Sequence, residues 1–253
     1  MEFERIADQK RLNFIIDTLE KNLPANSVVL DVGCGNGVIS RALGERGFNV
    51  YGIDISENAI AKAKQLNRSP NVRFDVLSAE QLQVSGIKYN AIICSEVLEH
   101  LHNPSSLLEV LHSSLDENGV LIVTVPNGKG PREMFVTKPV IALQKKNNWL
   151  WKAIQKMKRM LGYKGTTVQS DASDLTHIQF FTLKTLKQLA SSNNFSIQRF
   201  GKTNFIEDVF PFSLLAKRIK ILQKLDCAIA ELLPYGFTGG FVSVWKKNTD
   251  GNN

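Results

Sequence analysis

Three alternating glycines follow a short apolar run near the start of the chain. The run Val28–Leu30 leads to Asp31, and Gly33, Gly35 and Gly37 come soon after it. A buried strand, a tight turn and the start of a helix account for this pattern. Glycine tolerates positive φ and lets a ligand approach the backbone where a side chain would block it. The pattern therefore predicts a ligand-binding loop.

An acidic residue, Asp54, lies seventeen residues after Gly37, at the end of the second apolar run Asn49–Ile53. A carboxylate at the end of the second strand of such a unit can accept hydrogen bonds from both ribose hydroxyls of a nucleoside. The expected ligand is therefore a nucleoside derivative. The glycine spacing is G-x-G-x-G followed by Val38, which departs from the G-x-G-x-x-G of NAD-binding loops.

This loop resembles the first motif of class I S-adenosylmethionine-dependent methyltransferases, where it cups the amino-acid part of the cofactor. Three later segments carry the same resemblance. Tyr89–Leu101 resembles the fourth strand and following turn of the ubiquinone-biosynthesis O-methyltransferases and of their relatives on small molecules and glycans. Asp116–Leu121 is similar to the family turn L-x-P-G-G-x-L, although Glu117-Asn118 replaces Pro-Gly. His177–Thr182 resembles the C-terminal half of sugar- and lipid-directed methyltransferases.

The resemblance implies S-adenosylmethionine as the cofactor. It also implies that Asp54 binds the ribose and Ile55 packs on the adenine, while Asp31 orients the loop or accepts from the cofactor ammonium. Ser95 falls beside the sulfonium. The full set of implied cofactor-binding residues is Arg11, Asp31, Gly33, Cys34, Gly35, Gly37, Asp54, Ile55, Ser78, Ala79 and Ser95.

Two of these implied contacts have alternatives. Arg11 matches an arginine that binds the cofactor carboxylate in the ubiquinone O-methyltransferases, and its other interpretation is a surface arginine of a helix. Ser78-Ala79 stands where many relatives carry Asp-Ala, whose acid accepts from the adenine amino group. A hydroxyl or a backbone group would have to take that role here.

Methyl transfer to a hydroxyl requires that its proton be removed as the new bond forms. The candidate catalytic residues are His177 and His100, and His177 is favoured as the base or as the residue that orients the acceptor, because it begins the segment returning over the expected pocket. The alternative for His177 is a helix-flanking histidine held by a local hydrogen bond. His112 falls inside a predicted helix and His102 in a turn, so neither is a favoured base.

The E-x-x-E-H pattern at Glu96, Glu99 and His100 allows a different mechanism. It resembles the divalent-metal site of small-RNA 2′-O-methyltransferases, and His177 would complete that ligand set. A metal on the acceptor oxygen would lower its pKa and replace a base. Many relatives carry the Leu-Glu-His part without a metal, so we expect no metal site.

The net charge of +7 is concentrated in one segment. Residues 126–170 hold ten lysines and arginines and one acid, Glu133, so they carry +9 and the remainder carries −2. This charge is either a solvated surface or a patch that faces an anionic partner. Apolar residues at helical spacing occur in this segment and again in 212–233, which predicts lid helices packed on the body or, alternatively, a surface lying on anionic lipid. The lipid alternative implies peripheral contact of the protein with an anionic membrane. A nucleic acid is not an expected partner, because no RNA-binding module is recognisable in the sequence.

Strands and helices alternate along the rest of the chain, which predicts an α/β fold with a parallel sheet covered on both faces. The resemblance implies a Rossmann-like, seven-stranded, mostly parallel sheet whose last strand is antiparallel, with a helical insert after strand five. We expect one methyltransferase domain over 1–253. Its parts are an N-terminal helix 1–24, a cofactor-binding half 25–126, a basic helical insert 127–176 serving as a substrate lid, and a C-terminal half 177–247 that includes 212–233.

Ser56, Asn103 and Thr182 are the expected caps of three helices, and strand five is expected over Gly119–Val125. The chain is 43% hydrophobic and 22% charged, without a visible secretory signal or an apolar run of membrane-spanning length. Its three cysteines show no pairing or metal-ligand spacing, which fits a reducing cytosol. We therefore expect a cytoplasmic protein, either free or peripheral at the inner face of the membrane.

Together these features predict an S-adenosylmethionine-dependent methyltransferase that acts on an oxygen of a small molecule, a glycan or a lipid-linked intermediate. Two other functions remain open. One is a metal-assisted RNA 2′-O-methyltransferase. The other is a catalytically silent protein that binds the cofactor or serves as a scaffold.

Overall fold

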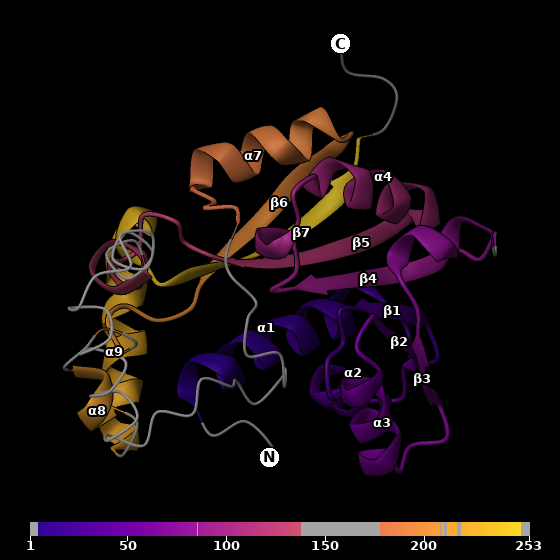
Figure 1. Cartoon of the computed structure of the whole chain (residues 1–253), viewed down its shortest axis with the longest axis horizontal. Coiled ribbons are helices and arrows are strands. Elements are labelled where there is room, and N and C mark those ends of the chain that lie inside the picture. The colour runs from indigo at the N-terminus through magenta and orange to yellow at the C-terminus, as the bar shows by residue number, and fades with distance from the viewer. Residues whose placement is uncertain are drawn as a thin grey trace, which may run out of the picture.

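The computed structural model describes residues 5–84, 86–137, 178–207, 209, 212–216 and 219–248. Seven strands form one sheet in the order β3-β2-β1-β4-β5-β7-β6 (Figure 1). These strands are β1 (Val28–Val32), β2 (Asn49–Asp54), β3 (Val72–Val76), β4 (Tyr89–Ser95), β5 (Leu115–Pro126), β6 (Phe195–Lys202) and β7 (Gly240–Lys247).

The first five strands pair in parallel, and β7 runs antiparallel to both of its neighbours, β5 and β6. The predicted seven-stranded, mostly parallel α/β sheet with an antiparallel last strand is therefore confirmed. Strand β5 begins at Leu115 rather than at Gly119, because Leu115 pairs with Tyr89 before a shift in register.

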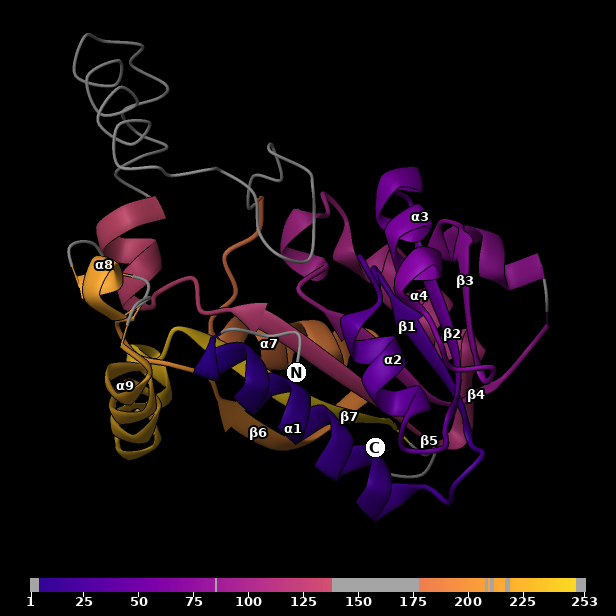
Figure 2. The ribbon, with the colours of Figure 1, turned by 90° about the horizontal axis from the view of Figure 1, so that it is seen from below.

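Helices cover both faces of the sheet, as Figures 1 and 2 show. Side chains alternate between faces along each strand, so each face has its own apolar core. The first core joins the sheet to α4 and α7, and the second joins it to α1, α2 and α3. The helix bounds are α1 (Ile6–Asn22), α2 (Val38–Gly44), α3 (Glu57–Leu66), α4 (Pro104–Ser114), α7 (Leu183–Ser192), α8 (Phe212–Ala216) and α9 (Lys220–Leu232), with short turns η1 (Ala79–Val84), η2 (Leu98–His100), η3 (Glu133–Thr137) and η4 (Tyr235–Phe237).

Two of the three predicted helix caps form. The Ser56 hydroxyl accepts from Ala59 N at the start of α3, and Thr182 makes a reciprocal capping box with Thr185 at the start of α7. The predicted Asn103 cap of α4 is wrong. Its side-chain amide instead donates to the Ser106 hydroxyl at 2.7 Å, and its oxygen accepts no backbone amide of the helix.

The predicted amphipathic segment 212–233 contains α8 and α9, and several of its large apolar side chains are exposed rather than packed on the body. Ile229 and Leu232 of α9 are exposed, whereas the buried side of that helix includes Gln223 and Asp226. Most of the predicted basic insert lies outside the described residues. Among the described helices, none is long and apolar enough to cross a membrane.

Candidate active site

The carboxyl ends of β1, β2 and β4 meet at one edge of the sheet. In register, Val32 pairs with Ile53 on one side and with Cys94 on the other. The glycine loop after β1, Asp54 at the end of β2 and Ser95 at the end of β4 are therefore neighbours. In parallel α/β sheets this edge is where ligands bind.

Three glycines give the loop after β1 its course. Gly33, Gly35 and Gly37 have φ of 67°, 55° and 79°, which L side chains rarely adopt. The backbone amides of Gly33 and Cys34 donate to Ile53 O at 2.9 and 3.0 Å, so the loop is tied to the end of β2. The loop is thus a backbone cradle rather than a flexible connection.

Close packing adds a second constraint on the outer glycines of this loop. A Cβ on Gly33 would lie 2.5 Å from Val97 Cγ2, and one on Gly37 would lie 2.4 Å from Phe74 Cζ. Any larger residue at either position would therefore have to displace a neighbour as well as adopt an unfavourable φ.

Asp54 is held by two backbone amides. One carboxylate oxygen accepts from Gly35 N and the other from Ser56 N, each at 2.9 Å. The adjoining Ile55 is 77% exposed. The carboxylate is therefore fixed beside the glycine loop, with an apolar side chain next to it that has no cover from the described residues.

Asp31 occupies a different environment. It is 1% exposed and accepts from the Ser40 hydroxyl at 2.6 Å. Burial, together with the nearby charge of Asp54, raises the pKa of Asp31 to about 7, although the hydrogen bond from Ser40 lowers it. Because Ser40 lies on α2, Asp31 connects β1 to the helix that follows the loop.

Arg11 of α1 reaches the same edge. Its Nη2 lies 3.7 Å from Glu96 Oε2 and 3.7 Å from Asp8 Oδ1, and its side chain is 14% exposed. Within the described residues, its buried Nε has no hydrogen-bond partner. The structure thus brings Arg11 into the site region rather than leaving it as a surface arginine.

Glu96 connects Arg11 to the sheet. Its backbone has φ 57°, which is unusual for glutamate, and its Oε1 accepts from the Thr124 hydroxyl at 2.9 Å. That hydroxyl also lies 2.9 Å from Ser95 Oγ. Thr124 is not among the site residues predicted from the sequence, although a polar residue within the apolar run of β5 is a detectable signal.

Glu99 is 1% exposed, and neither carboxylate oxygen has a hydrogen-bond partner within the described residues. Burial first, and then the charge of Glu96, raise the pKa of Glu99 well above its usual range. His100 Nε2 lies 3.8 Å from Glu99 Oε1. A buried carboxyl group with a raised pKa therefore adjoins the candidate base His100.

The chain returns to the body beside this turn. The backbone amides of Ile178 and Gln179 both donate to Glu99 O, at 2.8 and 2.9 Å. The predicted base His177 lies outside the described residues, but the residue that follows it contacts the E-x-x-E-H turn. Its proposed role thus stays a prediction.

The remaining predicted residues are positioned as follows. Ser78 and Ala79 follow β3 at the same edge, where Leu77 N donates to Asp54 O at 3.0 Å. No group of three or more His, Cys, Asp or Glu that could hold a metal occurs among the described residues. Since His177 is not among them, the expectation of metal-free catalysis stays a prediction.

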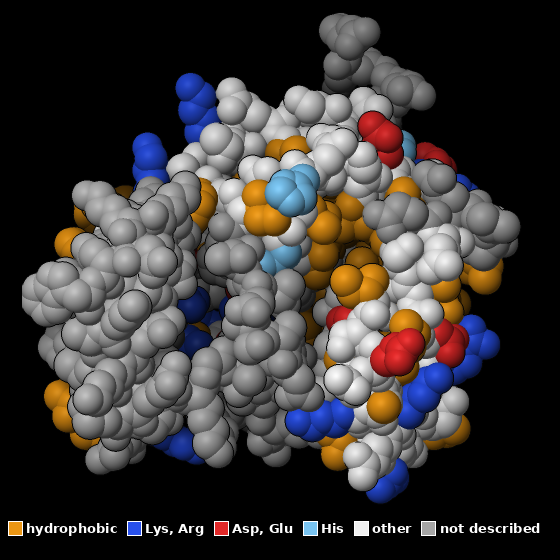
Figure 3. All heavy atoms as spheres, viewed as in Figure 1, with side chains coloured by type: hydrophobic (Ala, Val, Ile, Leu, Met, Phe, Trp, Pro, Cys, Tyr) orange, Lys and Arg blue, Asp and Glu red, His pale blue; other side chains and the backbone are white. Residues whose placement is uncertain are grey.

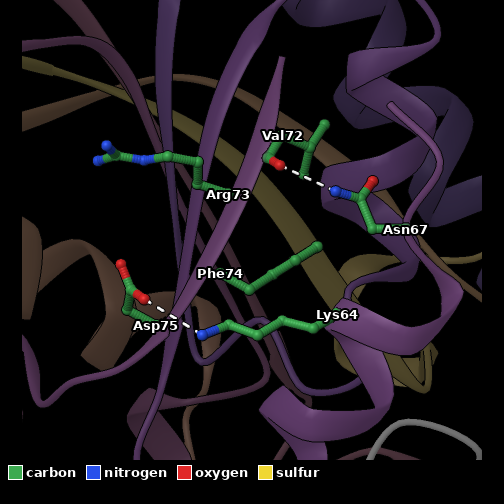
Figure 4. A pocket seen from close by; sticks show the side chains of 6 residues that line it. All are labelled: Lys64, Asn67, Val72, Arg73, Phe74 and Asp75. Atoms are coloured by element: carbon green, nitrogen blue, oxygen red, sulfur yellow. Dashed lines mark hydrogen bonds and ion pairs between the residues drawn. The ribbon is translucent and has the colours of Figure 1, made fainter. Parts of the chain in front are cut away.

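Figure 3 shows a hollow lined by hydrophobic side chains between the region of α4 and that of α2 and α3, with histidine side chains nearby. A separate recess of about 300 Å³ lies at the outer edge of the sheet, on β3 and α3 (Figure 4). It is lined by Lys64, Asn67, Val72, Arg73, Phe74 and Asp75, and the Lys64–Asp75 ion pair spans it at 3.4 Å. This outer recess contains none of the predicted cofactor-binding residues.

The profile of a family described as "Methyltransferase domain" matches residues 4–199. The chain belongs to this methyltransferase family. The resemblance to S-adenosylmethionine-dependent methyltransferases stated from the sequence is confirmed, as is the corresponding fold. The matched range of the methyltransferase domain includes the glycine loop, Asp54 and the E-x-x-E-H turn.

Curated relatives match a smaller part of this methyltransferase. The ubiquinone biosynthesis O-methyltransferase of Pseudomonas aeruginosa (strain UCBPP-PA14) is 35% identical over 115 residues, which cover 44% of this chain and 49% of that protein. The chain thus spans about half the length of the curated relatives it matches.

Solved structures resemble the methyltransferase over almost its full length. Magnesium protoporphyrin IX methyltransferase of Synechocystis PCC 6803, with bound SAH, is 21% identical, covers 96% of this chain and 84% of its own, and has a TM-score of 0.56. The 1,6-didemethyltoxoflavin-N1-methyltransferase of Burkholderia thailandensis, with S-adenosylhomocysteine, is 16% identical, covers 97% and 80%, and has a TM-score of 0.57. At these identities the likeness concerns the fold, so it does not decide the acceptor.

Proposed function

We propose that this methyltransferase binds S-adenosylmethionine and transfers the methyl group to an oxygen of a small molecule, a glycan or a lipid-linked intermediate. The observation that carries the cofactor assignment is the fixed pair formed by Asp54 and the positive-φ glycine loop. The bond from Gly35 N orients the Asp54 carboxylate at the edge where a ribose would lie. The O-methyltransferase name of the curated relatives supports oxygen as the methylated atom.

The residues of this edge fit the parts of such a cofactor. Asp54 offers acceptors for ribose hydroxyls, and the exposed side chain of Ile55 offers an apolar contact for the adenine. Arg11 offers a cation for the cofactor carboxylate, and its partly unpaired guanidinium is consistent with that role. Gly33, Cys34, Gly35 and Gly37 would contact the methionine part, and Ser78, Ala79 and Ser95 would line its surroundings.

When bound, S-adenosylmethionine supplies a methyl group on a positive sulfonium, which is already a strong electrophile. The protein then has to align the acceptor, exclude water and receive the acceptor proton. We assign proton removal to His177, with His100 as the second candidate. The buried Glu99 beside His100 would help to fix the ring of that histidine.

The cofactor assignment is tested by replacing Asp54 with alanine. Loss of the ribose hydrogen bonds should weaken binding of S-adenosylhomocysteine by roughly 1.5–3 kcal/mol, or about tenfold to a hundredfold. Isothermal titration calorimetry measures this change, and NAD should not bind to either protein. Asp75→Ala, one strand away on β3, is the matched control and should keep the wild-type affinity. Equal affinity in wild type and Asp54→Ala would reject the assignment.

The base is tested by comparing His177→Ala and His100→Ala with the exposed His102→Ala. Loss of a general base should lower kcat by about 10²–10⁴ and leave the affinity for S-adenosylhomocysteine unchanged. His102→Ala should retain activity. If neither His177→Ala nor His100→Ala lowers kcat, proton removal does not depend on these histidines.

Metal-free catalysis is tested with EDTA. We expect turnover to be unaffected by the chelator, because Glu96 is engaged by Thr124 and Arg11 and Glu99 is buried. Turnover that EDTA abolishes and magnesium restores would support the metal-assisted RNA alternative. Tight cofactor binding without transfer to any hydroxyl acceptor would support the catalytically silent alternative.

A further inference from the structure

The side of α9 that packs against the body carries the polar residues Gln223 and Asp226 together with the small residues Cys227 and Ala230. Gln223 Oε1 accepts from Ile6 N at 2.9 Å, and its side-chain amide donates to Ala216 O at 2.8 Å. Asp226 accepts from Phe205 N and Ile206 N at 2.8 and 2.9 Å. The hydrogen bonds of the buried side therefore fix the orientation of the helix about its own axis.

The opposite side of α9 is apolar and exposed. Ile221, Leu225, Ile229 and Leu232 are 65%, 54%, 46% and 87% exposed. Their spacing of four, four and three residues places them on one face of a helix. We call these four residues the outer face of α9. A surface helix normally turns such a face inward, so this arrangement marks an interaction surface.

The charges around the outer face of α9 indicate whether a second copy of the chain or anionic lipid binds there. Lys220 and Lys224 are exposed and lie along one border of that face. The acids of the same helix are neutralised or buried, because Asp226 is 3% exposed and Glu231 pairs with Lys10 at 2.5 Å. The border is thus positive. A second copy of the chain would bring an identical positive border to the contact, whereas anionic lipid would complement it.

We propose that α9 binds to the surface of an anionic bilayer, with its outer face among the lipid chains and Lys220 and Lys224 at the phosphates. An amphipathic helix with lysines beside the apolar face binds in this way, parallel to the membrane. The helix lies at the opposite end of the molecule from α3 (Figures 1 and 2). This inference does not depend on the proposed methyl transfer.

Sedimentation of the full chain with phosphatidylglycerol-containing vesicles and with pure phosphatidylcholine vesicles tests the proposal. The wild type should sediment with the former and much less with the latter. The variant Ile221→Ser/Leu225→Ser/Leu232→Ser should bind about tenfold more weakly or worse, since it loses most of the outer face. Lys220→Gln/Lys224→Gln should lose about tenfold at low salt and show a smaller loss at high salt.

Leu66→Ser is the matched control, because Leu66 is an exposed apolar residue at the end of α3. It should bind vesicles as the wild type does. All variants should bind S-adenosylhomocysteine as the wild type does, which shows that they are folded and separates this test from that of the cofactor. Absence of vesicle binding by the wild type, or equal binding by the triple serine variant, overturns the proposal. A dimer that the triple serine variant abolishes, without vesicle binding, identifies a second copy as the occupant.

Discussion

Four carboxylates at the carboxyl edge of the sheet have four different environments. Asp54 accepts from two backbone amides, whereas Asp31 is buried and accepts from one hydroxyl. Glu96 faces Arg11, and Glu99 is buried without a hydrogen-bond partner among the described residues. Hydrogen bonds and opposite charges favour the ionised form of a carboxyl group, whereas burial favours its neutral form. Residues of the same type can therefore have different roles at this edge of the sheet.

Asp31 should make the stability of the protein depend on pH. Its pKa is about 7 in the folded protein, compared with 3.8 for the unperturbed group. Between these values the folded state holds a proton that the unfolded state has released, so stability falls as pH rises from about 4 to about 7. The substitution Asp31→Asn replaces the titrating carboxyl group with a neutral amide. The unfolding free energy of the variant, relative to wild type, should therefore rise by up to about 1.4 kcal/mol per pH unit over this range.

Urea unfolding at several pH values measures the difference. Asp17→Asn is the control, because Asp17 is exposed on α1 and its replacement should leave the wild-type pH dependence unchanged. A difference between Asp31→Asn and wild type that stays constant from pH 4 to pH 8 would contradict the raised pKa.

Several residues of the site could be predicted from their types and spacing in the sequence, whereas the contacts between distant elements could not. Asp31, Asp54 and the glycines occur at family spacing within a short stretch, so the sequence indicates them directly. The contacts of Glu96 join α1, β4 and β5, which are distant in the sequence. Only the pairing of Ser95 with Thr124 in the sheet brings these groups together.

At the scale of elements, Phe74 couples the glycine loop to the sheet. Its ring on β3 occupies the space beside both Gly37 and Gly52, where an added Cβ would lie 2.4 Å and 2.6 Å from it. Gly37 also precedes α2 and has φ 79°. The third glycine of the loop thus serves close packing as well as backbone conformation.

Gly37→Ala should be more destabilising than the same change at Gly47. Gly47 has a similar φ of +85°, but the nearest atom to its added Cβ is 4.0 Å away. Gly47→Ala should cost about 1–2 kcal/mol for the positive φ alone. Gly37→Ala should cost about 1–3 kcal/mol more, because the methyl group overlaps the Phe74 ring. Urea denaturation compares the two, and equal losses would show that the contact with Phe74 has no energetic weight.

The order and type of the elements could be predicted from the sequence, because strands and helices differ in the spacing of their apolar residues and breakers such as Pro24 and Pro126 mark some of their ends. The sequence did not predict the orientation of α9. Periodicity identifies an apolar face but not the direction in which that face points. The inward direction of Gln223 and Asp226 depends on partners in α1 and on the segment after β6.

At the scale of the whole molecule, the two ends of the basic segment approach one another on the body. Gly128 N donates to Phe181 O at 2.6 Å, and an added Cβ on Gly128 would lie 2.5 Å from the backbone of Phe180. The chain thus passes the same place on the body at Gly128 and again at Phe181, next to the turn that holds Glu99. Most of the segment 127–176 lies outside the described residues, so its role as a cover over the acceptor site stays a prediction.

The charge of that segment should affect acceptor binding and not cofactor binding. Lys152, Lys156 and Arg159 lie outside the described residues, and they belong to the part of the sequence that carries +9 on a body of −2. If the acceptor or its carrier is anionic, replacing these three residues with glutamine should raise KM several-fold at low salt. The increase should shrink as salt rises, since exposed charges are screened over about 8–10 Å.

Steady-state kinetics at several salt concentrations measure this effect, with Lys62→Gln/Lys184→Gln/Lys246→Gln as the control for an equal loss of positive charge. These three lysines are exposed on α3, α7 and β7. The control should keep the wild-type KM if position matters, whereas an equal rise in both triple variants would indicate an effect of net charge alone. Affinity for S-adenosylhomocysteine should be unchanged in both, because Arg11, the glycine loop and Asp54 lie outside the segment. An unchanged KM at low salt in the Lys152, Lys156 and Arg159 variant would mean that these charges only solvate the surface.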